Sequence, residues 1–217
     1  VGHNALGVWW WLAETGQLGE RTSFVQQLGD ELLPVSIGRE NGRVTVSLSQ
    51  AMPRRIGDVG DLQALAEALG LDKTEPALGP QEAVVVSTGA AHMLVRLVSR
   101  DEVDRAEPDA SMLLPLLEHA GAQGCYVFTT SGEQRGEAYA RFFNPTVGIR
   151  EDPATGSAAG PLGWLLANRS GAGGQETFTV VQGVSMGRES HIRLLVRPDA
   201  VELTGSAVLT ATGQLHL

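Results

Sequence analysis

The sequence predicts an α+β protein of two lobes. Strand-like segments outnumber helix-like ones along the 217 residues, as in folds where a curled sheet wraps a central helix. One strongly apolar helix accompanies each set of strands. The two helices align without a gap, so that Gly2, Ala5, Trp10, Leu12 and Ala13 fall on Gly156, Ala159, Trp164, Leu166 and Ala167. Two copies of such a unit predict two equivalent lobes rather than a repeat array, although short helices rich in Ala, Leu and Gly also match by chance.

The first lobe is predicted to contain one helix and three strands. Helical periodicity covers residues 4–12, and alternating segments follow at 23–27, 32–37 and 44–48. The Asn41-Gly42 pair between the last two is a hairpin signal. We interpret residues 52–55 as a linker, which makes residues 1–52 the remainder of an N-terminal lobe and residues 53–217 the C-terminal lobe.

The second lobe is predicted to be richer in strands. Pro115 weakens the prediction for the first turns of one of its helices. The final segment, about 205–217, is expected to return to the first lobe. In chain order the predicted elements are a helix at 61–70, strands at 83–87 and 93–98, a helix at 110–120, strands at 124–129 and 137–143, a helix at 157–168, and strands at 177–182, 191–196, 201–203 and 207–211.

The composition limits which binding partners and which cellular compartment we expect for the protein. With 16 Lys and Arg against 25 Asp and Glu, the formal charge is −9, and without a basic stripe we expect neither nucleic acid nor a membrane surface as partner. Cys125 is the single cysteine, which excludes an intrachain disulfide and predicts a buried side chain. The apolar run 5–13 is too short to cross a bilayer and lacks the basic flank of a secretory signal. We therefore expect a cytoplasmic protein.

The run from Glu151 to Gly160 is the most informative segment for function. A helix that begins at Gly156 or Ser157 leaves its first backbone N–H groups unpaired, and its dipole is positive there, so it favours carboxylate or phosphate oxygens. Asp152, just upstream, is then placed to transfer a proton. The segment predicts a site for a small anionic substrate.

Each candidate residue also has a simpler structural interpretation. Asp152 precedes a proline and can be a turn acceptor only, and Ser157 can cap the helix. His3, which falls on Ser157 in the internal alignment, is either an end-cap or a neutral imidazole that relays a proton. The remaining histidines have no metal-ligand spacing with one another or with the cysteine and are interpreted as structural or solvated: His92, His119, His191 and His216.

Several motifs together carry a resemblance to a known family. They are Glu-Asp-Pro-Ala-Thr-Gly-Ser at 151–157, Arg-Phe-Phe-Asn-Pro at 141–145 with Gly148, Gly2-His3, Ser87-Thr88-Gly89, Gln182-Gly183 followed by Gly187-Arg188, and the ending 205–217. With these motifs the sequence resembles the PhzF (phenazine biosynthesis-like) family over nearly its whole length. The resemblance implies the two-lobed diaminopimelate epimerase-like fold, in which each lobe is a curled, mostly antiparallel sheet around a central helix.

The resemblance also implies an isomerase or epimerase that transfers a proton on a small carboxylate substrate in the cleft between the lobes, without metal or organic cofactor. It assigns catalytic roles to His3, Asp152 and Ser157. It assigns substrate binding to Gly2, Asn4, Thr155 and Gly156, although Asn4-Ala5 departs from the Ala-Thr usual after this histidine. Family members are often dimers, so a homodimer is expected.

The resemblance further predicts that the chain is incomplete. The family's acid/base glutamate lies upstream of the Gly-His turn, and Val1 opens directly onto that turn. We therefore expect missing upstream residues, a first lobe incomplete at its N-terminal end, and a chain that lacks the glutamate.

Two alternative functions stay open. A non-catalytic protein of the same fold would use the helix starts only to bind a small anion. A serine hydrolase is suggested because His3, Asp152 and Ser157 are the residue types of a catalytic triad. The spacing from Gly156 to Gly160 is not that of the G-x-S-x-G nucleophile elbow, which disfavours the hydrolase.

Overall fold

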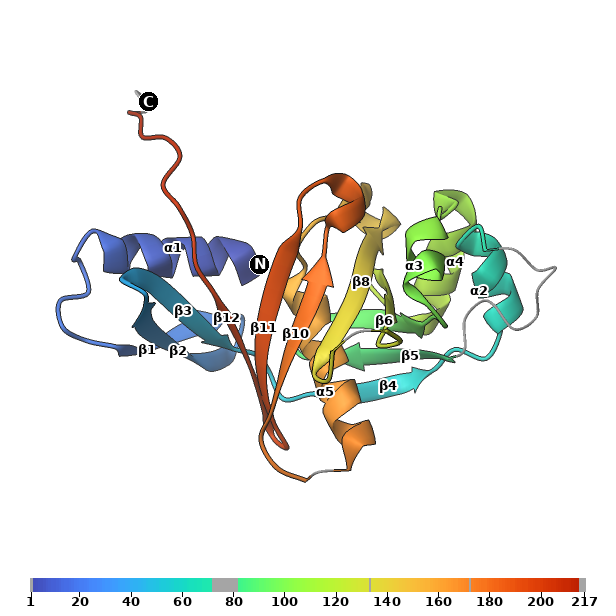
Figure 1. Ribbon diagram of the computed structural model, residues 1–217, viewed down its shortest axis with the longest axis horizontal. Helices are drawn as coiled ribbons and strands as arrows, with labels where there is room; N and C mark the ends of the chain where they lie inside the picture. Colours follow the sequence, from blue (N-terminus) through green and yellow to red (C-terminus); the bar gives the residue numbers. More distant parts are fainter. Residues whose placement is uncertain (1, 72–81, 133, 172, 215–217) are drawn as a thin grey trace. The chain divides into compact units, whose positions relative to one another are not determined.

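The computed structural model describes residues 2–71, 82–132, 134–171 and 173–214 (Figure 1). The chain divides into two compact units: unit 1 comprises residues 1–49 and 204–217, and unit 2 comprises residues 50–203. Val1 and residues 215–217, which enter the predictions above, lie outside the described residues. The lobe boundary between residues 52 and 53 stays a prediction.

In unit 1 one helix packs on a small antiparallel sheet. Helix α1 (Gly2–Glu14) contacts β2 (Glu31–Glu40) and β3 (Arg43–Ser49), and β2 pairs on its other side with β1 (Ser23–Leu28). All four elements confirm the prediction for this part of the chain. The β2–β3 turn passes through Asn41 and Gly42 with φ of 50° and 80°, as an Asn-Gly pair in a two-residue hairpin requires.

The core of unit 1 is aromatic and aliphatic. Trp10 is buried with Val35, Val44, Val46 and Leu48. The alternation of buried and exposed residues along the strands places this set on the face that α1 covers. Chain 204–206 returns beside β3, where Ser206 donates a hydrogen bond to the Val44 carbonyl at 2.6 Å.

Unit 2 contains a mostly antiparallel sheet in the order β12-β11-β10-β8-β7-β6-β5-β4, with β9 beside β8. The β6–β7 and β8–β10 pairs are parallel, and β4–β5, β5–β6, β7–β8, β8–β9 and β10–β11 are antiparallel. The end of β12, from Thr204, belongs to unit 1. In chain order the elements are β4 (Arg54–Asp58), α2 (Leu62–Ala68), β5 (Glu82–Ser87), β6 (Ala91–Arg96), α3 (Arg100–Arg105), α4 (Ala110–Ala120), β7 (Cys125–Thr129), β8 (Glu137–Asn144), β9 (Ile149–Asp152), α5 (Gly156–Ser170), β10 (Glu176–Gln182), β11 (Ser190–Arg197) and β12 (Ala200–Gly205).

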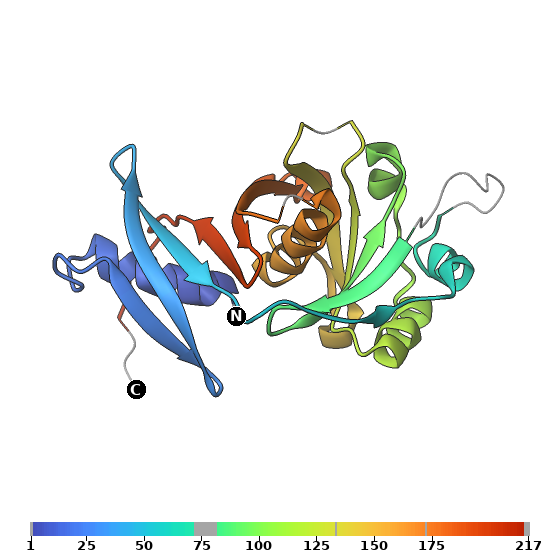
Figure 2. The ribbon, with the colours of Figure 1, turned by 90° about the horizontal axis from the view of Figure 1, so that it is seen from below.

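Helices cover both faces of this sheet (Figure 2). Val85, Met93 and Cys125 share one buried core with residues of α2, α3 and α4. Their neighbours along the same strands point to the opposite face, where α5 contacts β5, β6, β10 and β11. A helix surrounded in this way is buried on most sides, which explains the apolar sequence of α5. The predicted α+β class is confirmed.

Some predicted elements are wrong or incomplete. Residues 207–211 form no strand; Ala207 packs against the core of unit 1, but Val208 and Leu209 are 76% and 59% exposed. The predicted linker 52–55 overlaps β4, an edge strand whose charged, mostly exposed residues conceal it. Helix α3 and strand β9 were not predicted. No helix among the described residues has the length and apolar character needed to cross a membrane.

Candidate active site

The Glu151–Ser157 segment is held in place by an ion pair at its start. Arg141, on β8, makes two parallel hydrogen bonds of 2.9 Å to the carboxylate of Glu151. Its remaining terminal nitrogen donates to the carbonyls of Val103, Asp104 and Ala106. Burial alone would raise the pKa of Glu151, but the hydrogen bonds and charge of Arg141 outweigh it and hold that pKa below its ordinary value. The pair therefore anchors β9 to β8 as an ionised bridge.

Asp152 and Thr155 are tied together by the fully buried side chain of Gln182, at the end of β10. Gln182 Nε2 donates to the Asp152 carbonyl at 2.6 Å and to Thr155 Oγ1 at 3.0 Å. Gln182 Oε1 accepts from the Thr155 amide at 3.2 Å and from the Tyr126 hydroxyl at 2.7 Å. The amide thus makes four hydrogen bonds, its full complement.

The partners of Gln182 determine which atom is the donor in each of these hydrogen bonds. The Thr155 amide can only donate and the Asp152 carbonyl can only accept, so the orientation of the Gln182 amide is unambiguous. Because Thr155 Oγ1 accepts from Gln182, its own proton goes to Asp152 Oδ2, 2.5 Å away. Tyr126 remains a phenol, since burial and then the charge of Asp152 raise its pKa well above the ordinary value. One carboxylate oxygen of Asp152 thereby accepts a hydrogen bond from inside the protein, and the residue is partly exposed.

Helix α5 begins at Gly156, as predicted, and opens with unpaired amides. The N–H groups of Ala158 and Ala159 both bond to the Thr155 carbonyl. The amides of Gly156 and Ser157 have no acceptor within the described part of the chain. Two adjacent donors at the positive end of a helix form a site for a carboxylate or phosphate oxygen.

The first turn of α5 is also braced from the side. Gln50 donates to the Gly156 carbonyl at 2.8 Å and accepts from the Thr88 hydroxyl at 2.7 Å. A Cβ on Gly160 would lie 1.7 Å from Gln50 Oε1, so the glycine makes room for this brace.

His92, on β6, contacts the predicted catalytic serine. Its Nε2 lies 3.2 Å from Ser157 Oγ, and the residue is 3% exposed. His92 was predicted to be structural or solvated, and neither this contact nor the role of Gln182 was predicted from the sequence. Polar residues in otherwise apolar strands were the available signal for both.

The predicted residues of unit 1 lie in the first turn of α1. His3 and Asn4 are exposed and Gly2 is partly exposed. The structure thus brings Asp152, Thr155, Gly156 and Ser157 together within unit 2, and Gly2, His3 and Asn4 within unit 1.

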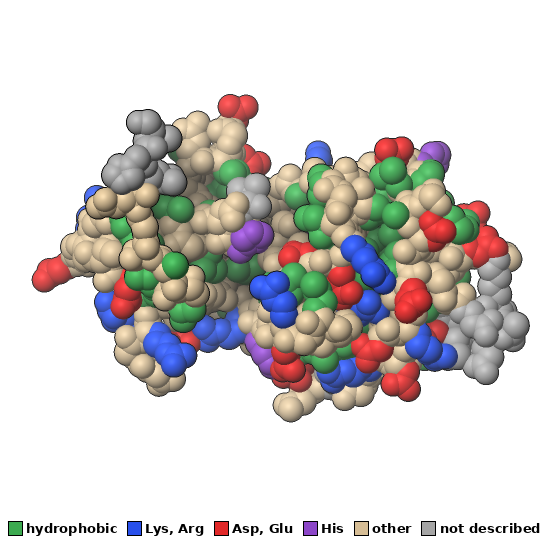
Figure 3. All heavy atoms as spheres, turned by 90° about the horizontal axis from the view of Figure 1, so that it is seen from above, with side chains coloured by type: hydrophobic (Ala, Val, Ile, Leu, Met, Phe, Trp, Pro, Cys, Tyr) green, Lys and Arg blue, Asp and Glu red, His purple; other side chains and the backbone are tan. Residues whose placement is uncertain are grey.

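The unit 2 residues provide a carboxylate, a hydroxyl and two amide donors. Such a set can bind an anionic group and exchange a proton beside it. The described residues contain no group of three metal-ligating side chains. On the face of unit 2 drawn in Figure 3, acidic and basic side chains are interspersed.

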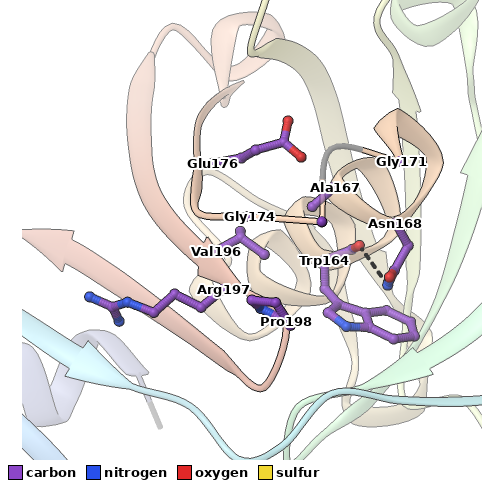
Figure 4. A pocket seen from close by; sticks show the side chains of 10 residues that line it. Trp164, Ala167, Asn168, Gly171, Gly174, Glu176, Val196, Arg197 and Pro198 are labelled. Carbon is purple, nitrogen blue, oxygen red and sulfur yellow. Dashed lines mark hydrogen bonds between the residues drawn. The ribbon is translucent and has the colours of Figure 1, made fainter.

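A separate pocket of about 160 Å³ lies near the other end of α5 (Figure 4). There Asn168 donates to the Trp164 carbonyl at 3.1 Å, and Arg197 is paired with Glu202 at 2.5 Å. These polar groups of the pocket therefore serve local structure.

Comparisons with known proteins bear on the family and the fold. The chain is 29% identical to an uncharacterized isomerase of Clostridium acetobutylicum, over 91% of this chain and 69% of that protein. It is 31% identical to the trans-2,3-dihydro-3-hydroxyanthranilate isomerase of Pseudomonas aeruginosa, over 85% of this chain and 64% of that enzyme. The crystal structure of a PhzF-family protein from Bacillus anthracis matches with a TM-score of 0.81 at 24% identity, over 95% of this chain and 72% of that one, and confirms the predicted fold. The family model for phenazine biosynthesis-like proteins, PhzC-PhzF, matches residues 1–213. The chain therefore belongs to the PhzC-PhzF family.

Proposed function

We propose that this chain acts as a cofactor-independent isomerase or epimerase that moves a proton on a small carboxylate metabolite. The observation that carries the proposal is the directed hydrogen-bond chain from Gln182 through Thr155 to Asp152, next to the unpaired amides of Gly156 and Ser157. Relatives named as isomerases support the reaction class. One of them acts on a hydroxyanthranilate, which is a small carboxylate.

In this proposal different residues bind the substrate and exchange the proton. The amides and the Ser157 hydroxyl bind the carboxylate of the substrate, where partial charges on N–H groups are most effective. Asp152 exchanges the proton through the oxygen that Thr155 does not occupy. The Thr155 hydroxyl donates to Asp152 and the Thr155 amide donates to Gln182, so neither is free to donate to the substrate. Thr155 therefore contributes to substrate binding indirectly, by fixing the position of Asp152.

The remaining assignments rest on the family resemblance. His3 is proposed to take part in the same reaction, with Gly2 and Asn4 contacting the substrate. A glutamate, which the resemblance places before the Gly-His turn, is proposed as the second acid/base group. A cytoplasmic homodimer is proposed on the same basis.

The test is solvent-deuterium incorporation into candidate carboxylates by the protein, beginning with trans-2,3-dihydro-3-hydroxyanthranilate. Asp152→Asn should slow incorporation by about 10²- to 10⁴-fold, the usual contribution of a general acid or base. Asp199→Asn, the same chemical change at an exposed turn, should leave it unchanged. Undiminished exchange in Asp152→Asn would remove this aspartate from the mechanism.

A non-catalytic anion-binding protein is the second candidate, and the unpaired amides at the start of α5 favour it equally. Calorimetric binding of a carboxylate without any deuterium incorporation would establish it.

A further inference from the structure

We propose that His92 is a positioning residue for Ser157: it is neutral, carries its proton on Nε2, and donates it to Ser157 Oγ, so that the serine hydroxyl proton is free for the ligand. This inference rests on the proposed function in assigning Ser157 to carboxylate binding. The state of the imidazole itself follows from the surroundings of the ring.

First, the ring of His92 lies in a buried environment. His92 is 3% exposed and lies on β6, with Val86 opposite it on β5. The ring of Phe142 meets it edge to face at 5.1 Å. Ser157 is its hydrogen-bond partner among the described residues, at 3.2 Å from Nε2, and Nδ1 is buried without a partner.

The second step is the charge. An imidazolium in this place would bury two N–H donors and satisfy only one, and burial lowers the pKa of His92 to about 4. At neutral pH the ring therefore carries one proton.

The third step is the position of that proton. If it were on Nδ1, the protein would bury an unsatisfied N–H donor. If it is on Nε2, the donor is satisfied by Ser157 and Nδ1 is left as an unpaired acceptor. An unpaired buried donor and an unpaired buried acceptor each cost about 1–3 kcal/mol, but orphaned buried N–H donors are rarer than under-satisfied acceptors, so the arrangement favours the Nε2–H form.

The hydrogen bond from His92 determines what the Ser157 hydroxyl can do. Its oxygen accepts from His92, so its own proton has no internal acceptor among the described residues. Together with the amides of Gly156 and Ser157, the hydroxyl gives three donors in one turn. This set matches the acceptor-only oxygens of a carboxylate.

Nitrogen NMR of ¹⁵N-histidine-labelled protein tests the inference directly. Long-range proton–nitrogen correlations distinguish a protonated ring nitrogen from an unprotonated one, and the spectrum of His92→Gln identifies the signals that belong to His92. We expect Nε2 protonated and Nδ1 unprotonated at pH 7. A proton on Nδ1 would overturn the proposal, and because this readout needs no turnover it stands apart from any failure of the proposed function.

Matched variants test the effect on ligand binding. In His92→Gln the side-chain amide reaches the Nε2 position and can donate to Ser157, whereas His92→Leu cannot. We expect His92→Leu to raise KM about tenfold with kcat little changed, as the loss of ground-state binding predicts, and His92→Gln to recover most of that loss. Equal damage in the two folded variants would show that the histidine only fills space and would refute the positioning role.

Discussion

Gln182 and Thr155 exchange two hydrogen bonds across 27 residues of sequence: the Thr155 amide donates to Gln182 Oε1 at 3.2 Å, and Gln182 Nε2 donates to Thr155 Oγ1 at 3.0 Å. Because both residues are buried, these bonds are shielded from water. They connect the end of β10 to the turn before α5 and thereby orient Asp152.

Gln182→Met should be strongly destabilising. The substitution keeps the side-chain volume but leaves the Thr155 amide, the Asp152 carbonyl and the Tyr126 hydroxyl without their partner. We expect a loss of about 3 kcal/mol in the free energy of unfolding, measured by urea denaturation. Gln123→Met, at an exposed position, should change it by less than about 0.5 kcal/mol. Equal stability of the two variants would contradict the buried network.

Gly183, directly after Gln182, is predicted to tolerate no side chain. It has φ of +81°, and a Cβ would lie 2.4 Å from the Arg188 carbonyl oxygen and 2.7 Å from that of Pro153. Gly187 has a similar φ of +64° with nothing within 4 Å. Gly187→Ala should therefore cost only the left-handed backbone penalty, about 1 kcal/mol, while Gly183→Ala should cost about 3 kcal/mol.

The comparison of the two alanine variants isolates the steric effect from the backbone effect. Urea denaturation at one pH measures both. If Gly183→Ala were no less stable than Gly187→Ala, this result would contradict the close approach of Gly183 to Pro153.

The sequence predicted the local features of the site and missed the long-range ones. The helix start at Gly156 and the position of Asp152 before it could be inferred because caps, turns and apolar periodicity are encoded within a few residues. His92 contacts Ser157 across 65 residues, and no local pattern encodes which strand lies beside which helix.

The misassigned fold elements have the same origin. Strand β4 consists largely of exposed and charged residues because it pairs only with β5 at an edge. Residues 207–211 have a strand-like composition, yet they have no partner strand among the described residues. Tertiary context thus overrode local propensity in both directions.

Ser157 should resist labelling by a fluorophosphonate. In a serine hydrolase the base receives the serine proton on Nε2 while Nδ1–H is held by a carboxylate. Here His92 Nδ1 is buried without a partner, and the lowered pKa, about 4, makes the ring a weak base. We expect no covalent adduct by mass spectrometry of the intact protein, with a known serine hydrolase as the positive control. An adduct mapped to Ser157 would restore the hydrolase alternative.

The stability of the protein should depend on pH through His92. Burial lowers the pKa of this histidine in the folded protein to about 4, whereas the unfolded chain has the ordinary value of 6.5. Below pH 6.5 the unfolded chain therefore binds a proton that the folded protein rejects, so stability is full above this pH and falls as the pH approaches 4. At about 1.4 kcal/mol for each pH unit between the two pKa values, the His92 contribution to this loss is about 3 kcal/mol.

Urea denaturation of the wild type and of His92→Gln between pH 7.5 and pH 4 measures this contribution, with the pH range chosen to span about one unit beyond the ordinary histidine pKa. Carboxylates that titrate in both proteins cancel in the difference between the two curves. We expect that difference to be constant above pH 6.5 and then to shift steadily in favour of the glutamine variant as the pH falls to about 4. Parallel curves over the whole range would mean that His92 has the same pKa in the folded protein and in the unfolded chain, and would contradict its buried neutral state.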